Sequence, residues 1–501
     1  MAQQLIATRS PAAYRGVLAY AHQHSGEAAA AAYLALGHAS MLDRHYDDAV
    51  ASFHQAALKG TSLDDYADYL GAQANLQAGH AADAYALLDH FAQRHPDSIF
   101  DDDAPVLLAN AYIQQNNPQA AVKLLQPMLD TPIASHNDFR YALGRAYQTA
   151  GDTGQATQVF RSLYLTQPLS SEAAQARTQL QAMGSPLSAA ERKSHADQLF
   201  NAKRYAEAGG EYHAIEHDAA GLGTADRNAL QIYAAVCDMK LKRISRREVE
   251  HLPDTADDSA ALKQYMLAEL SRNDNDETGH DAIIAQMVQR FPTSRWLEEA
   301  LFSGGNMYLL KHNPTQATYH YSLLVKLFPN SVYAPPAHWR AAWMNYRLRN
   351  YAEAARLMDE HIQMFPASME VPSALYWRGR IYEDEEHNFG QAVNYYRVLT
   401  ETYTNFYYGN LGKQRLAVLR AQTPSIPSPV LSAVPPREVP ELTGELPENE
   451  PHLIKARLLA NAALNEYIGA EIQASPTSNG WGALAEAEIY ASYGENTRSL
   501  Q

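Results

Sequence analysis

The stretch that decides the fold is LGRAYQTAGDTGQATQVFRSLYLTQP, residues 143–168. In it Gly144 is followed by Ala156, then by Phe160 and finally by Pro168. A glycine and an alanine allow two helix backbones to approach closely, and an aromatic ring fills the space toward the next pair. Proline ends the second helix because it lacks an N–H donor and clashes with the preceding turn. The stretch therefore predicts a helix–turn–helix unit.

The same spacing recurs elsewhere in the chain. It returns at Gly305, Ala317, Tyr321 and Pro329, and more loosely at Gly37, Ala49 and Phe53. Units of roughly 34 residues with small and aromatic residues at fixed places are typical of tetratricopeptide-like (TPR-like) repeats. The prediction is an all-α fold, a right-handed superhelix of such repeats, with curvature into a U or a ring left open.

Changes in the repeat pattern divide the chain into five predicted segments. Residues 11–220 and 294–420 carry TPR-like repeats, and residues 221–293 lose the register, which predicts an irregular helical connection. Eight of the 25 prolines lie in residues 421–451, which predicts a linker. Residues 452–501 are predicted to form helices that lead to a C-terminal domain missing from this chain.

Composition narrows the classes of partner. The formal net charge is −16, which disfavours nucleic acid or an anionic membrane as the main partner. Cys237 is the single cysteine, so neither an internal disulfide nor a cysteine-based zinc site is expected. No apolar run reaches the ~18 residues of a membrane-spanning helix, and the first ten residues carry no signal-peptide pattern.

Three strings follow one another in the second half of the chain: ALYWRGR at 374–380, AVNYYR at 392–397 and YTNFYYG at 403–409. In this order they resemble the helical region of soluble lytic murein transglycosylases, where an Ala-Leu-Tyr-Trp helix precedes a Tyr-Tyr-Gly segment. The resemblance extends over nearly the whole chain. It implies a periplasmic protein of cell-wall turnover whose helical body surrounds a lysozyme-like catalytic domain.

One departure from that family concerns catalysis. Its catalytic acid is a glutamate in a Glu-Ser-x-Phe segment, and no glutamate in this chain is followed by serine. We therefore expect a scaffold without catalytic residues, which positions a lytic module or binds murein or cell-wall proteins. Whether the parent protein is an enzyme stays open. The alternative is a general TPR protein–protein interaction module, in envelope assembly or as a cytosolic adaptor.

The candidate binding residues are arginines and aromatic residues of the C-terminal repeats. If Trp339 and Tyr382 are packed, four residues project to the inner, concave face: Arg340, Arg347, Tyr376 and Arg380. Guanidinium groups near aromatic rings suit a carboxylate-bearing peptide or glycan. The alternative is ion pairing with the many acids of the chain. A further candidate is Phe406-Tyr407-Tyr408, which stacks on a sugar ring or covers the end of the core.

No cofactor or metal site is predicted. Among the 20 histidines, His213 and His217 lie four residues apart on one helix face, but a metal ion needs at least a third ligand. No phosphate-binding glycine loop or nucleophile elbow occurs either.

Overall fold

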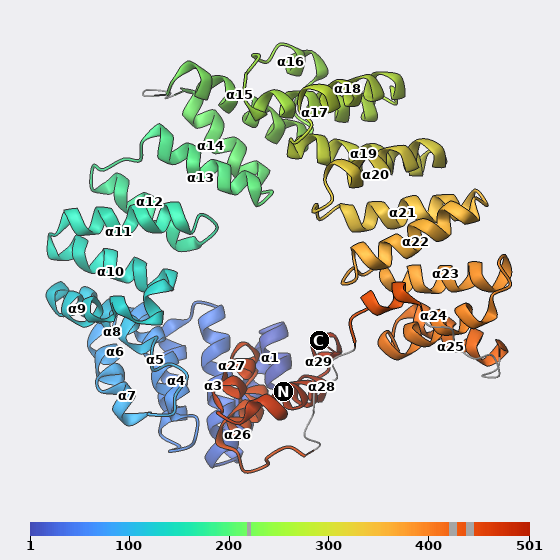
Figure 1. The fold of residues 1–501 in the computed structure, drawn as a ribbon. Coiled ribbons are helices and arrows are strands. Elements are labelled where there is room, and N and C mark those ends of the chain that lie inside the picture. The colour runs from blue at the N-terminus through green and yellow to red at the C-terminus, as the bar shows by residue number, and fades with distance from the viewer. Residues whose placement is uncertain (218–221, 420–427, 437–444, 501) are drawn as a thin grey trace. The chain divides into compact units, whose positions relative to one another are not determined.

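A computed structural model of the chain describes residues 1–217, 222–419, 428–436 and 445–500. Within these residues all regular structure is helical, comprising α1 to α29 and five short 3-10 helices, and no strand occurs (Figure 1). The predicted all-α class, built from successive helix pairs, is thereby confirmed. The predicted curvature into a U or a ring stays a prediction.

The chain divides into two compact units. The first comprises Met1–Glu191 together with Pro440–Gln501, and the second comprises Arg192–Val439. The helices of the first unit are α1 (Ala2–Thr8), α2 (Pro11–Gln23), α3 (Gly26–Leu42), α4 (Tyr46–Ala57), α5 (Asp64–Ala78), α6 (Ala81–Leu88), α7 (Phe91–Arg94), α8 (Ala104–Gln114), α9 (Pro118–Leu125), η1 (Gln126–Asp130), η2 (Pro132–Ser135), α10 (Asn137–Ala150), α11 (Thr153–Thr166), α12 (Ser171–Ala182), α26 (Pro451–Asn461), η4 (Asn465–Tyr467), α27 (Ile468–Ala474), η5 (Ser478–Gly480), α28 (Gly482–Ser492) and α29 (Asn496–Leu500).

The second unit continues the helix pairs. Its helices are α13 (Ala189–Asn201), which begins at the boundary, α14 (Tyr205–His217), α15 (Thr224–Lys240), α16 (Arg246–Glu250), α17 (Asp258–Asn273), α18 (Glu277–Arg290), α19 (Arg295–Leu310), α20 (Pro314–Leu327), α21 (Ala334–Arg347), α22 (Tyr351–Met364), α23 (Val371–Asp384), α24 (Phe389–Thr402), α25 (Tyr407–Leu419) and η3 (Pro429–Ala433). The predicted irregular connection contains α15 to α18, of which α16 has only five residues.

The glycine-to-aromatic spacing corresponds to a direct contact between paired helices. A Cβ atom added to Gly144 on α10 would lie 2.5 Å from Cε1 of Phe160 on α11. The same contact joins Gly37 to Phe53, Gly305 to Tyr321 and Gly379 to Tyr396. Each of these four aromatic rings is buried. The spacing thus encodes a close helix–helix approach that only glycine permits, and it recurs in both units.

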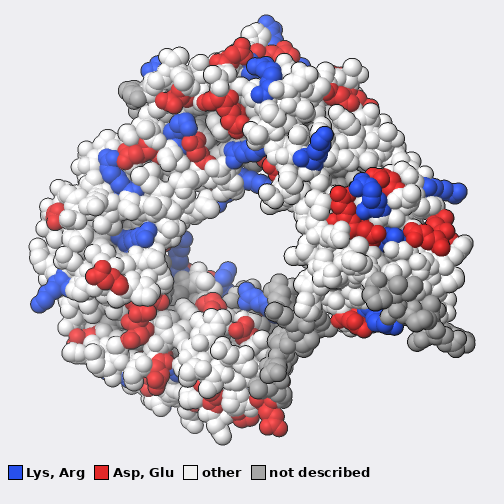
Figure 2. Space-filling model, in the orientation of Figure 1, with Lys and Arg blue, Asp and Glu red and all other residues white. Residues whose placement is uncertain are grey.

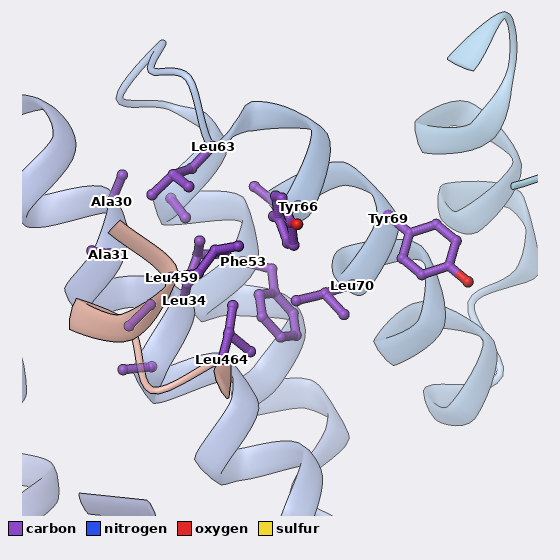
Figure 3. Packing of buried hydrophobic residues seen from close by; sticks show 14 of the residues in the cluster. Ala30, Ala31, Leu34, Phe53, Leu63, Tyr66, Tyr69, Leu70, Leu459 and Leu464 are labelled. Carbon is purple, nitrogen blue, oxygen red and sulfur yellow. The ribbon is translucent and has the colours of Figure 1, made fainter. Parts of the chain in front are cut away.

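The described residues from 451 onward pack on the first helices of the chain. Leu459 of α26 and Leu464 beside it are buried in one hydrophobic core with Leu34 of α3 and Tyr66 of α5 (Figure 3). The predicted five segments and the missing C-terminal domain stay predictions. The repeat spacing contains no signal for this long-range packing.

Polar groups reinforce the same contact. Glu471 of α27 is fully buried and accepts a hydrogen bond of 2.6 Å from the Tyr66 hydroxyl. Its other carboxylate oxygen lies 2.9 Å from Nδ1 of His452. Lys455 of α26 pairs with Asp65 at 2.8 Å. Since isolated buried charges are costly, these partners fix how the last helices dock on α5.

The predicted linker is only partly described. Residues 421–427 and 437–444 of it lie outside the described residues. Between them η3 packs against α22, and its Leu431 side chain is buried in the core of the second unit. None of the helices in the described part of the chain has the length and apolar character that a membrane crossing requires.

A buried histidine in the second unit makes stability depend on pH. Burial, with a smaller contribution from His338, lowers the pKa of His361 to about 3. Its Nε2 lies 3.0 Å from Oγ of Ser368. In the unfolded chain a histidine has a pKa of about 6.5, so below this pH the unfolded state binds a proton that the folded state does not bind.

We therefore expect stability to be full above pH 6.5 and to fall as the pH decreases toward 3. Between pH 7.5 and 5.5 the protonation of this histidine in the unfolded chain should lower the free energy of unfolding by about 1.4 kcal/mol. Urea unfolding of the parent chain and of His361→Gln at both pH values measures the effect. The variant should lose about 1.4 kcal/mol less than the parent over this interval. Equal losses in the two proteins would show that His361 does not carry the pH dependence.

Candidate protein-interaction groove

A groove in the first unit runs over helices α3, α5, α8, α10 and α12. Its volume is about 540 Å³. We call it the amide groove, and its lining consists of Met41, Tyr46, Gln73, Leu76, Gln77, Leu107, Asn110, Ile113, Gln114, Tyr141, Arg145 and Gln175. Apart from Tyr46 on α4, every lining residue comes from the first helix of a pair or from α12.

Two neighbouring helices present the same pattern to the groove. The string QANLQ at residues 73–77 of α5 corresponds to NAYIQ at residues 110–114 of α8, 37 residues later. In each string two carboxamides lie one helical turn apart and flank an aliphatic side chain, so all three share one face. The groove therefore has an apolar floor, from Leu76 and Ile113, with amide groups beside it.

Most of these amides are available for a partner. Gln114 Nε2 donates to the carbonyl oxygen of Leu76 at 3.2 Å, which fastens α8 to α5. Within the described part of the chain, the side chains of Gln77, Asn110 and Gln175 have no hydrogen-bond partner. A carboxamide carries an N–H donor and a C=O acceptor, the same two groups that a peptide backbone offers.

Arg145 brings a cation to the α10 side of the groove. It projects one turn after Tyr141, and its Nε is buried without a hydrogen-bond partner among the described residues. Leaving a buried donor unsatisfied costs about 1–3 kcal/mol. A guanidinium binds carboxylates in a planar, two-pronged geometry. The α10 side of the groove is therefore suited to an anionic group.

The seven residues selected from the sequence all lie in the second unit. Arg340 hydrogen-bonds Asn306 and lies over the ring of Phe302, 5.1 Å from its centroid. Arg347 is exposed beside a small crevice next to His312. The prediction that these arginines bind a ligand stays a prediction.

The structure brings Arg380 and Tyr376 together. Arg380 Nε donates to Asp384 at 2.9 Å, and the buried Tyr376 hydroxyl lies 3.4 Å from the same guanidinium. The alternative considered for these arginines, ion pairing with the acids of the chain, is thus observed for Arg380. Arg340 differs, because its hydrogen-bond partner is the amide of Asn306.

Such pairs are frequent on neighbouring helices. Arg356 bridges Glu353 and Glu360, and Arg378 lies 2.9 Å from Asp359. Figure 2 shows acidic and basic side chains side by side over α22 and α23. On the face shown, both signs of charge are mixed there.

The aromatic run at the start of α25 divides into two parts. The Phe406 and Tyr407 side chains are exposed, with Tyr407 at 71%. Tyr408 instead packs beside Tyr376, with ring centroids 5.3 Å apart, and receives a hydrogen bond from Nε1 of Trp377 at 3.4 Å. Tyr408 therefore covers the end of the core, whereas sugar stacking by its two neighbours is untested.

The two histidines selected from the sequence differ in their surroundings. His213 lies 3.0 Å from Glu216 and 2.9 Å from Asp238, and His217 is exposed at the end of α14. A group of three possible metal ligands exists elsewhere, at His280, Asp281 and His320. Sequence spacing gives no hint of it because 39 residues separate Asp281 from His320.

The comparisons with known proteins agree with the repeat architecture. Residues 75–131 match the family described as tetratricopeptide repeat, a range that contains much of the amide groove. The chain is thus a TPR-like, all-helical repeat protein. No curated protein matches it.

Three solved structures are similar to parts of the chain. The TPR domain of P58(IPK) is 18% identical, covering 71% of this chain and 98% of its own, with a TM-score of 0.24. The Cut9–Hcn1 hetero-tetramer of APC/C is 15% identical, covering 93% and 91%, with a TM-score of 0.25. The human IFIT1 dimer with m7Gppp-AAAA is 12% identical, covering 87% of each chain, with a TM-score of 0.30. At these values nothing about the function of this chain follows from them.

Proposed function

We propose that this chain is a protein-interaction scaffold whose amide groove binds an extended segment of a partner protein. The observation that carries the proposal is a set of polar groups in the groove that have no hydrogen-bond partner within the described residues: the carboxamides of Gln77, Asn110 and Gln175, and the buried Nε of Arg145. The proposal corresponds to the general interaction module that the sequence left as an alternative.

The spacing of the amides suits an extended chain. Two residues one turn apart on a helix are separated by about 6 Å along its axis. Two residues of an extended strand rise by about 6.6 Å, and every second backbone amide faces the same way. A segment lying along α5 and α8 can therefore meet Gln73 and Gln77 with successive backbone groups, while Leu76 and Ile113 contact its side chains.

Arg145 specifies the charge of the segment. It requires a carboxylate, either an acidic side chain or the C-terminal carboxylate of the partner, since these are the planar anions that a peptide offers. We therefore propose a partner segment that is extended and carries a carboxylate at one position.

A variant of Arg145 tests this assignment. Peptides selected on the purified parent chain from a random library with free C-termini provide the ligand. Arg145→Ala should weaken their binding between tenfold and a hundredfold, as expected for about 1.5–3 kcal/mol from a hydrogen bond to a charged group. Arg145→Lys should bind more tightly than Arg145→Ala but less tightly than the parent chain, because it keeps the charge and loses the two-pronged geometry of the guanidinium.

Gln158→Ala is the matched control, since this exposed residue lies on α11 and does not line the groove. Its affinity for the same peptides should equal that of the parent chain. Peptides that bind Arg145→Ala as well as the parent chain would contradict the assignment of Arg145 to a carboxylate, and failure to select any peptide would contradict peptide binding in the groove.

A second candidate function rests on the strings of residues 374–380, 392–397 and 403–409. They support the hypothesis of a superhelical scaffold of a soluble lytic transglycosylase-like protein in the periplasm, with peptidoglycan or a C-terminal lytic domain as its partner. Retention on purified murein tests it. Reduced retention of the double variant Arg340→Ala, Arg380→Ala would support it. The absence of retention, or retention unchanged in this variant, would argue against these residues and this partner.

A further inference from the structure

Two histidines and one aspartate converge between helices α18 and α20. Oδ1 of Asp281 lies 3.1 Å from Nδ1 of its neighbour His280 and 3.2 Å from Nε2 of His320. The three ligand atoms all lie within 4.8 Å of one another. Four ligands around a zinc ion, bound at about 2.0–2.2 Å in a tetrahedron, are separated by roughly 3.3–3.5 Å. The two shortest separations here differ from that value by only a few tenths of an ångström.

We infer that His280, Asp281 and His320 form a binding site for a divalent transition-metal ion, with Zn²⁺ as the best match. Two imidazoles and one carboxylate are the donors that Zn²⁺ and Co²⁺ accept, and three protein ligands leave a fourth position for water. The site lies in the second unit and is independent of the amide groove.

The neighbouring helices hold the ligands in place. Both imidazoles are buried, with exposed fractions of 0% for His280 and 1% for His320. Gly304 on α19 makes room for them, because a Cβ there would lie 2.8 Å from Cε1 of His280 and 2.9 Å from Nδ1 of His320. The rings therefore have little freedom to turn away from each other.

The carboxylate is also oriented by a second group. The Tyr308 hydroxyl donates to Oδ2 of Asp281 at 2.7 Å, which leaves Oδ1 directed at the two histidines. Such outer contacts to a ligating carboxylate are typical of metal sites. The Asp281 side chain is 38% exposed, so an ion can reach the site from this side.

The two rings each turn one nitrogen toward the carboxylate. Nδ1 of His280 and Nε2 of His320 both face Oδ1 of Asp281, so these are the nitrogens that offer a lone pair to an ion. When an ion binds, the ring protons that now face Asp281 move to Nε2 of His280 and Nδ1 of His320. These two nitrogens are buried and have no hydrogen-bond partner in the described part of the chain, so we expect an affinity on the order of micromolar rather than nanomolar.

The test uses the full chain after removal of metal with a chelator. Co²⁺ is added first, because a tetrahedral Co²⁺ site gives an intense visible absorption band, and Zn²⁺ is then titrated to displace it. We expect one Co²⁺ per chain at this site, displaced by Zn²⁺, and a higher melting temperature in the presence of Zn²⁺.

Two variants remove ligands. His320→Gln should lose the visible band and weaken binding at least tenfold. Asp281→Asn should have the same effect, and because it changes a partly exposed position, it serves as the test if His320→Gln fails to fold. The matched control is His361→Gln, which removes a buried histidine of the next pair of helices whose Nε2 faces Ser368. It should keep the band.

Three results would overturn the proposal. They are the absence of a visible band in the parent chain at 100-fold molar excess of Co²⁺, a band that persists in both His320→Gln and Asp281→Asn, and a Zn²⁺-induced rise in melting temperature that is equal in the parent chain and in Asp281→Asn.

Discussion

Gly144→Val is expected to lower the free energy of unfolding by about 3 kcal/mol. The first added carbon alone would lie 2.5 Å from the ring of Phe160, a residue that is fully buried between α10 and α11. The packed ring has no space to retreat, so the two helices must separate or the ring must leave its rotamer. Urea unfolding followed by circular dichroism measures the loss.

The control for this prediction lies on the neighbouring helix. Gly154 belongs to α11, and a Cβ there would meet only Oδ1 of Asp152, at 3.7 Å. Gly154→Val should therefore remain within about 0.5 kcal/mol of the parent chain. Adding Phe160→Leu to Gly144→Val should restore part of the loss, because a smaller side chain yields space to the valine. Equal stability of the two valine variants would mean that the glycine-to-aromatic contact does not hold the repeats together.

Glu471→Ala is expected to lower the free energy of unfolding by about 3–5 kcal/mol and to loosen the last helices from the other helices of the first unit. The substitution removes the acceptor of the buried Tyr66 hydroxyl. It also leaves His452 and Lys455 without the carboxylate that lies 2.9 Å and 3.7 Å from them. Hydrogen exchange should therefore rise in α26 to α28 well before it rises in α10 and α11.

A nearby acid serves as the control for Glu471. Glu466 is half exposed, and its carboxylate lies 3.8 Å from Nε2 of His38, which is beyond hydrogen-bond distance. Glu466→Ala should change the free energy of unfolding by no more than about 0.5 kcal/mol. It should leave the hydrogen exchange of α26 to α28 unchanged. If Glu471→Ala behaves in the same way, the buried network does not fasten these helices.

The helix pairs could be predicted from the sequence because they depend on contacts between near neighbours. Gly144 and Phe160 are 16 residues apart, and the same interval joins Gly37 to Phe53. A recurring interval of this length is visible in one sequence. The docking of the last helices is different, since Tyr66 and Glu471 are 405 residues apart. No spacing rule marks such a contact.

The candidate site was predicted less well than the fold. Arginines on a predicted inner face draw attention by their charge, yet Arg380 pairs with Asp384 of the following turn. The amide groove had a signal in the sequence, the related strings QANLQ and NAYIQ at residues 73–77 and 110–114. Carboxamides are common on helix surfaces, so the pattern acquires meaning only when the structure shows Asn110 and Arg145 lining the same groove.

The central claim is that the amide groove binds an extended segment of another protein. Photo-crosslinking in the cell of origin tests it most directly, with p-benzoylphenylalanine placed at Asn110 in the groove and, as the control, at Gln158 on α11. We expect Asn110 to capture a defined partner segment containing a carboxylate, Arg145→Ala to abolish this capture, and Gln158 not to capture it. Capture of the same partner from both positions, or capture at Asn110 that is unaffected by Arg145→Ala, would contradict it.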